Sequence, residues 1–293
     1  MLDLDPTRTG PPPRDASTLV VVRDRTSGDG IEVFCVERRK GGFLGGAVVF
    51  PGGKLEEADL DPGWRALVTP PRRWAASQAT DEASLRGLAI AACREALEEA
   101  AILPVDGPSP AHAQLLEWRQ RLARDEGSLR AMLEAHGLRL DLAALCPLAR
   151  WVTPVSEQRR FDTRFFLFVA DGSVIGAHDD DETTSSFWAT PVEVLRRFAS
   201  GELQLAPPTH RTLEVLVAAR DAKHAVAVAE GACLEPICPR LFSCQDAQGE
   251  TVALALPGDA EHDVRERRSP GSTRYLLRGG RFVPEEASYL PSR

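Results

Sequence analysis

Three glutamates close together on one predicted helix are the residues best placed to do chemistry. They belong to the stretch REALEEAAI, residues 94–102. At about 100° per residue, Glu95, Glu98 and Glu99 fall within an arc of about 100° on one side of the helix. Three carboxylates this close repel one another unless a cation neutralises them, and magnesium is the usual ion where a substrate phosphate completes the shell. Taken alone, the same pattern is also typical of a solvated acidic helix face.

A glycine-rich segment before this helix extends the pattern. The segment FPGGKLEEAD covers residues 50–59, and Arg94 stands directly before the first glutamate of the helix. Together they resemble the Nudix hydrolase box, which runs Gly, five residues, Glu, seven residues, then Arg-Glu-apolar-x-Glu-Glu-x-Gly-apolar. Gly53 then opens the box, and Asp59 stands at the place of its first glutamate. By this resemblance the chain is identified as a member of the Nudix family.

The chain departs from the family box in three ways. Asp59 is shorter than the usual glutamate, which a supporting role tolerates. Ala101 replaces a glycine, so we expect the exit from the helix to be made differently. Between Asp59 and Arg94 there are 34 residues where the family has seven. We expect this insert, about residues 60–80, to be a surface excursion whose proline-rich part can be shortened with modest loss of stability.

The insert and its flanks narrow the resemblance to a subgroup similar to coenzyme A diphosphatases. The similarity includes RRKGGFLGGAVVFPGGKLEEAD and RWVTPVSEQRRFDTRFFLFVA, and it spans most of residues 17–220. It implies hydrolysis of coenzyme A or acyl-coenzyme A to phosphopantetheine and adenosine 3′,5′-bisphosphate. NADH and ADP-ribose are alternative substrates. A nucleotide sensor that no longer cuts is a third alternative, against which the intact carboxylates count.

The resemblance also implies roles for the matching residues. Magnesium, with manganese as an alternative ion, would be bound by the backbone carbonyl of Gly52 and by the carboxylates of Glu95, Glu98 and Glu99. Of these, Glu98 and Glu99 are also assigned to the catalytic set, together with Arg94. Arg94 would orient the acids through charge-assisted hydrogen bonds, while Gly53 and Asp59 support the loop.

Further candidates lie on loops and at strand ends. Glu182, in the acidic stretch DDDETTSS, is our candidate for the general base, and a solvated acidic loop is an equal interpretation. Four arginines are candidates for binding substrate phosphates, with ordinary surface charge as the alternative: Arg38, Arg39, Arg160 and Arg164. Three aromatic residues could stack a base or belong to the core: Trp151, Phe161 and Trp188.

The elements that must position these residues favour the α/β class. The resemblance implies a Nudix α/β/α sandwich with a mixed sheet, an insertion in the box and extra helices. Strands are predicted at 17–24 and 31–39, which form a hairpin, and at 146–154, 160–170 and 187–190. Helices are predicted from about 80 to 103, twice within 111–136, and at 191–201 and 208–223.

The domain organisation follows from these elements. We expect a flexible tail over residues 1–16 and a Nudix domain over 17–230 that contains a helical insert at about 108–137. Residues 231–293 would form an extension of short strands packed on that domain.

Composition limits the partners. Against 35 lysines and arginines there are 43 aspartates and glutamates, a net charge of −8, which argues against a broad electrostatic grip on nucleic acid. Neither a membrane-spanning run nor a targeting segment is apparent, so we expect a cytoplasmic protein without a membrane partner. The expected partner is a small-molecule nucleotide, and the sequence is compatible with a homodimer.

Overall fold

A mixed β-sheet forms the centre of the computed structural model, which describes residues 5, 7–40, 45–71, 78, 81–246 and 249–285. The strands that pair in the order β5-β6-β1-β2-β3-β8 are β1 (Arg14–Asp24), β2 (Ile31–Arg38), β3 (Ala47–Val49), β5 (Cys146–Val152), β6 (Phe161–Val169) and β8 (Gln204–Leu205). Two further strands, β4 (Gly52–Lys54) and β7 (Thr183–Ala189), pair with β1 and β2 respectively. The predicted hairpin is confirmed, since β1 and β2 are antiparallel, while β1 and β6 are parallel.

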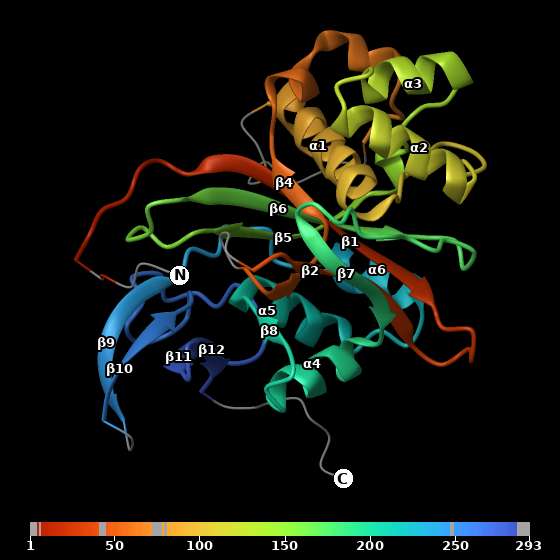
Figure 1. Ribbon diagram of the computed structural model, residues 1–293. Coiled ribbons are helices and arrows are strands. Elements are labelled where there is room, and N and C mark those ends of the chain that lie inside the picture. The colour runs from red at the N-terminus through yellow and green to blue at the C-terminus, as the bar shows by residue number, and fades with distance from the viewer. Residues whose placement is uncertain are drawn as a thin grey trace.

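Helices cover both faces of this sheet (Figure 1). One face carries α1 (Glu82–Ala100), α2 (His112–Ala123) and α3 (Leu129–His136), and the other carries α4 (Pro191–Ala199), α5 (Pro207–Leu216) and α6 (Ala222–Glu230). Successive residues of β1 point to opposite faces. Leu19 and Val21 therefore pack in the core under α1, whereas Val20 and Val22 pack in the core under α5. This three-layer arrangement confirms the predicted α/β/α sandwich.

The helix that carries the three glutamates begins and ends with identifiable caps. The side chain of Asp81 accepts a hydrogen bond from the amide of Ser84, which starts α1 near the predicted residue. At the other end Ala101 has φ 51° and ψ 42°, the left-handed conformation, and the amide of Ile102 donates to the carbonyl of Ala96. This is the usual glycine-type exit made with alanine, so the expectation of a different exit is wrong.

The box insert is partly core rather than a surface excursion. Two short 3-10 turns, Glu57–Leu60 and Pro62–Ala66, bring Trp64 into the core that packs on α1, where it is 5% exposed and its Nε1 donates to the carbonyl of Ala58. Val68 is buried and forms a β-bridge with Leu140, after the helical pair. Shortening this part would therefore remove core contacts, contrary to our expectation. Residues 72–77, 79 and 80 of the insert lie outside the described residues.

Three other sequence expectations need correction. The expected flexible tail over residues 1–16 overlaps β1, which begins at Arg14 because residues 14–22 pair with β6. The helix expected over 208–223 is two helices, since Asp221 caps α6 through the amide of His224. Strand β7 begins at Thr183, four residues earlier than expected.

Residues after α6 form a second, antiparallel sheet. It consists of β9 (Arg240–Asp246), β10 (Gly249–Ala255), β11 (Arg274–Arg278) and β12 (Arg281–Pro284), paired in the order β12-β11-β10-β9. In Figure 1 it lies beside α5 and β8, and its buried residues join the core under α5. Within the described residues, α-helices long and apolar enough to cross a membrane do not occur.

Candidate active site

The three glutamates of α1 line one cavity. Glu99 is 3% exposed, and one of its carboxylate oxygens accepts a hydrogen bond of 2.9 Å from the amide of Gly52. Glu95 and Glu98 face the same space, a cavity of about 620 Å³ between the end of α1, β4 and the strands β5 and β6. The helical spacing therefore places these acids together as the sequence predicted, and at a cavity large enough for a nucleotide.

Gly52 and Gly53 are required by close approach. They lie on β4, which pairs antiparallel with β1, and neither has a positive φ. A Cβ on Gly53 would lie 2.2 Å from Oε1 of Glu95, and one on Gly52 would lie 2.5 Å from the carbonyl oxygen of Ser17. A side chain at either position would displace the carboxylate or the strand. The glycines thus let the β4 backbone reach the acids.

Arg94 organises the acids from within. Its guanidinium pairs with both carboxylate oxygens of Asp59 at 3.1 Å, and its Nη1 lies 2.9 Å from Glu95 and 3.0 Å from Glu98. Asp59 is 1% exposed and also accepts from the amide of Glu56 at 2.9 Å. This bidentate pair joins the two parts of the box across the insert.

Burial of these acids raises their pKa values. Desolvation raises the pKa of Glu98 to about 7 and that of Glu99 to about 8, and it also raises the pKa of Glu95. The positive charge of Arg94 opposes this effect on Glu95 and Glu98, while the Gly52 amide opposes it at Glu99. A site that makes its own carboxylates costly to ionise favours an added cation.

The donor set suits a divalent ion after a small rearrangement. In the described part of the chain, no three carboxylate, imidazole or thiolate groups are already gathered at metal-binding distances. Instead, one nitrogen of Arg94 bridges Glu95 and Glu98. These carboxylates, with the buried Glu99, need only turn toward a cation to give the oxygen ligands that magnesium and manganese prefer.

Glu182 reaches the same cavity from the opposite side. Its carboxylate lies 3.3 Å from Nη2 of Arg38, and Nη1 of Arg38 lies 3.9 Å from Glu99. The Arg38 guanidinium therefore lies between the loop acid and the helix acid. The negative charge of Glu182 also contributes to the raised pKa values of Glu95 and Glu99. The sequence-predicted Arg38 and Glu182 are thus both at the site.

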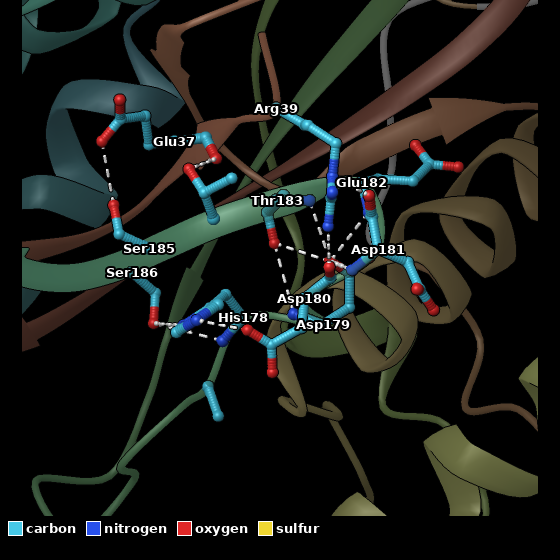
Figure 2. Close-up of polar contacts among 12 residues, drawn as sticks. Glu37, Arg39, His178, Asp179, Asp180, Asp181, Glu182, Thr183, Ser185 and Ser186 are labelled. Carbon is cyan, nitrogen blue, oxygen red and sulfur yellow. Dashed lines mark hydrogen bonds and ion pairs between the residues drawn. The ribbon is translucent and has the colours of Figure 1, made fainter.

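The acidic loop that carries Glu182 is held by hydrogen bonds rather than by a helix. Figure 2 shows Asp179 at its centre: one carboxylate oxygen accepts from the amides of Asp181, Glu182 and Thr183 and from the Thr183 hydroxyl, at 2.8 to 3.1 Å. Arg39, the residue that follows β2, donates from its side chain to the carbonyls of Asp180 and Asp181 and so holds the loop against the sheet. The Arg39 amide donates to the Glu182 carbonyl at 2.8 Å.

Comparison with known proteins agrees with this geometry. The crystal structure of a NUDIX hydrolase from Alicyclobacillus acidocaldarius superposes with a TM-score of 0.59 and 33% identity, covering 74% of this chain and 96% of that one. This chain belongs to the Nudix hydrolase family. The family profile described as "NUDT19 Nudix domain" matches residues 76–216.

Curated relatives point to one subgroup of this Nudix family. The chicken protein named acyl-coenzyme A diphosphatase NUDT19 is 31% identical over 60% of this chain and 58% of its own length. The Xenopus laevis protein of the same name is 28% identical over 78% of this chain and 70% of its own length. The chain therefore spans between about half and three quarters of the relatives that it matches.

Three of the four arginines predicted to bind substrate are not among the residues that line the cavity of the α1 glutamates. Arg164 is buried, and it donates to the carboxylate of Asp15 and to the carbonyls of Gln78 and Asp162. Arg160 donates to the carbonyls of Pro11, Thr153 and Pro154. Arg39 holds the acidic loop. These three side chains donate hydrogen bonds to other residues of the protein. Of the four predicted arginines, Arg38 therefore remains as the one that lines the cavity of the α1 glutamates.

Other residues complete the cavity wall. Arg159, next to Arg160 in the sequence, is exposed and lines the cavity opposite α1. Trp151 and Phe161 line it too, whereas Trp188 packs edge-on against Phe34 and donates to the carbonyl of Ile175. The pair Arg159-Arg160 was visible in the sequence, but which of the two faces the cavity depends on how the loop before β6 folds.

Proposed function

We propose that this chain hydrolyses the diphosphate bond of coenzyme A or an acyl-coenzyme A, giving phosphopantetheine or its acyl form and adenosine 3′,5′-bisphosphate. The observation that carries the proposal is the cavity in which Glu95, Glu98 and Glu99 converge with the Gly52 amide. The names of the curated relatives support the choice of substrate. The intact acids count against a sensor that binds a nucleotide without cutting it.

Magnesium is the ion we propose for this site, with manganese as a substitute. Glu95, Glu98 and Glu99 would bind it through carboxylate oxygens, together with the carbonyl of Gly52. Bound there, the ion would neutralise charge on the diphosphate and make a bound water more acidic. Arg94 would keep the acids in register, since its bidentate pair with Asp59 fixes the guanidinium whether or not Glu95 and Glu98 turn away from it.

The remaining wall supplies the other roles. Glu182, exposed at the mouth and paired with Arg38, would accept the proton of the attacking water. Arg38 would pass from Glu182 to a diphosphate oxygen as substrate enters, since both acceptors are anionic. Arg159 would bind a phosphate on the adenosine side. Trp151 and Phe161 offer ring surface for the adenine, although Trp151 is only 3% exposed.

A substrate panel with magnesium and product identification tests the proposal. The measurement is kcat/KM for coenzyme A, dephospho-coenzyme A, NADH and ADP-ribose. We expect coenzyme A to exceed dephospho-coenzyme A by about tenfold to a hundredfold, because one well-placed arginine recognises the 3′-phosphate with about 1.5–3 kcal/mol. Arg159→Gln should reduce that ratio, whereas Arg124→Gln, on an exposed residue after α2, should not. A preference for NADH or ADP-ribose would reject coenzyme A and leave the Nudix chemistry standing.

A further inference from the structure

A second cavity lies next to the cavity of the α1 glutamates. Its volume is about 450 Å³, and it is enclosed by β5, α5, the end of α6 and residues 267–270, which precede β11. The two cavities share one residue, Trp151, whose side chain belongs to both walls. None of the three glutamates of α1 borders the second cavity. Its contents would therefore be separate from the reacting groups.

The charged groups of this wall are all cationic. Arg211, Arg267 and Arg268 line the cavity, and no aspartate or glutamate is among its described lining residues. This is unusual for a protein with a net charge of −8, whose carboxylates outnumber its lysines and arginines. Three arginines that line one cavity attract an anion, and the planar guanidinium matches the geometry of carboxylate and phosphate oxygens.

Two of these arginines are held in place by the fold. Arg211 is 2% exposed; its Nη1 donates to Glu214 at 2.5 Å and its Nη2 to the carbonyl of Ser272. Arg268 donates through Nη1 to the carbonyl of Pro236. Arg211 is thus held through both terminal nitrogens and Arg268 through one, which lowers the entropic cost of ordering these side chains around a ligand.

The same two side chains also retain buried donors without an acceptor. Nε of Arg211 and Nε of Arg268 are both buried and have no hydrogen-bond partner among the described residues. A buried donor that makes no hydrogen bond destabilises the fold, because its lost hydration is not replaced. Arg267 is exposed and forms no hydrogen bond or ion pair with the part of the chain that the structure describes. An oxygen-rich anion in the cavity could satisfy these groups after small side-chain rotations.

The rest of the wall is mostly apolar. Leu148, Val215, Val228 and Ile237 contribute aliphatic side chains, and Trp151 contributes an indole ring. Burying an apolar tail against such a surface removes apolar area from water and so stabilises a complex. The cavity therefore combines an anion-binding end with an apolar body, as ligand pockets commonly do.

We propose that this cavity binds a small amphipathic oxyanion, with a carboxylate or phosphate head at the arginines and a short aliphatic tail along β5 and α5. The site is distinct from the proposed diphosphatase function and does not depend on it. Because Trp151 belongs to both walls, a ligand here would contact a residue that also borders the catalytic cavity.

Calorimetric titration of the full chain tests the site with defined probes. Two probes carry both parts of the ligand: octanoate has a carboxylate head and octyl phosphate has a phosphate head. Inorganic phosphate tests the head group alone, and octanol tests the aliphatic tail alone. The test variant is Arg267→Gln with Arg268→Gln, and the matched control is Arg265→Gln, an exposed arginine of the same segment that does not line the cavity. Arg38→Gln is the control for binding at the cavity of the α1 glutamates, because Arg38 is the cation that lies between Glu182 and Glu99 there.

A cysteine at the cavity reports where binding occurs. Cys233 is exposed and lines the second cavity, whereas Cys244 is partly exposed and lies on β9, outside that wall. Alkylation by iodoacetamide, read by mass spectrometry, should slow at Cys233 when the ligand is present and remain unchanged at Cys244. This measurement does not use enzymatic activity.

The expected result is that octanoate or octyl phosphate binds at least tenfold more tightly than octanol and protects Cys233. The double substitution should weaken this binding at least tenfold, whereas Arg265→Gln and Arg38→Gln should not. The better of the two anions identifies the head group. Inorganic phosphate that binds as tightly as octyl phosphate would overturn the role of the tail. Equal affinities in the wild type and the double variant, or no binding of any probe, would overturn the site.

Discussion

The two sources of acids at the catalytic cavity are positioned by different means. On α1, helical spacing alone puts Glu95, Glu98 and Glu99 on one side, and burial raises their pKa values. In the acidic loop, no regular element fixes Glu182; the hydrogen bonds to Asp179 do, and its carboxylate remains largely exposed. Helix periodicity thus places the proposed metal ligands, whereas a turn centred on Asp179 and tied to the rest of the sheet by Arg39 places the proposed base.

If this contrast is correct, the largest loss of activity follows substitution on the helix. Glu98→Gln and Glu99→Gln each remove a negative oxygen ligand and should lower kcat by about a hundredfold or more, as loss of electrostatic stabilisation of a transition state does. The fold should persist, because the apolar face of α1 is unchanged. Steady-state kinetics with magnesium and circular dichroism check both points. Near-normal kcat in both variants would remove the metal assignment.

A smaller loss is expected at the loop acid itself. Glu182→Gln should lower kcat by about tenfold to a hundredfold, at or below the usual range for general-base catalysis, because the proposed cation already acidifies the water. Unchanged kcat would favour the alternative interpretation, in which Glu182 belongs to a solvated acidic loop. Asp181→Asn, also in the loop, serves as the control.

The hydrogen-bond network gives an effect smaller still. Asp179→Ala removes the acceptor that fixes the turn around Glu182, so kcat should fall by about threefold to tenfold while KM changes less, since the group is displaced rather than removed. Asp171→Ala is the matched control, because it breaks a similar turn, to the amide and hydroxyl of Ser173, away from the cavity. Equal losses in the two variants would indicate a general effect of loop disorder.

The raised pKa values of the helix acids predict how metal-free stability depends on pH. Because burial raises the pKa of Glu98 to about 7 and of Glu99 to about 8, the folded state holds protons that the unfolded state has already lost. This contribution is fully present below about pH 4.5 and is lost as pH rises to about 8. The melting temperature in chelator should therefore fall by a few degrees from pH 5 to pH 8, and magnesium should reverse the fall.

Two variants test the assignment of this pH dependence. Glu99→Gln should flatten the slope, since it removes the acid whose pKa is highest of the three. Glu57→Gln, on an exposed residue of the first 3-10 turn, should leave it unchanged. A slope that is the same in all three proteins would place its origin outside the helix acids.

The smallest expected effect concerns the junction between the two regions. The amide of Ala177, in the segment leading to the acidic loop, donates to the carbonyl of Ala100 at 2.7 Å, just before the left-handed Ala101. Ala101→Gly should relieve about 1 kcal/mol of left-handed strain and lose about 0.8 kcal/mol of buried methyl, for a net change within about 1 kcal/mol. Ala100→Gly, in a right-handed position, should destabilise by about 1–2 kcal/mol. Denaturant unfolding distinguishes them, and equal losses would contradict the strain argument.

The sequence by itself determined what depends on neighbours along the chain. Helix periodicity and local sterics act over a few residues, so the sequence predicted the start of the helix near residue 80, the spacing of Glu95, Glu98 and Glu99, and the glycine-rich turn before the helix. The β1–β2 hairpin and the layered α/β class could be predicted for the same reason. These features suffice for the family and for the helix side of the site.

Only the tertiary structure decided which hydrogen bonds form between residues that are far apart in the sequence. Arg164 is buried and pairs with Asp15, 149 residues away, while Arg159 lines the cavity. Trp64 enters the core although its segment is irregular and proline-rich. The sequence gives the charge and type of each residue. Whether the hydrogen-bond donors of a guanidinium find partners depends on which acceptors the fold brings within about 3 Å.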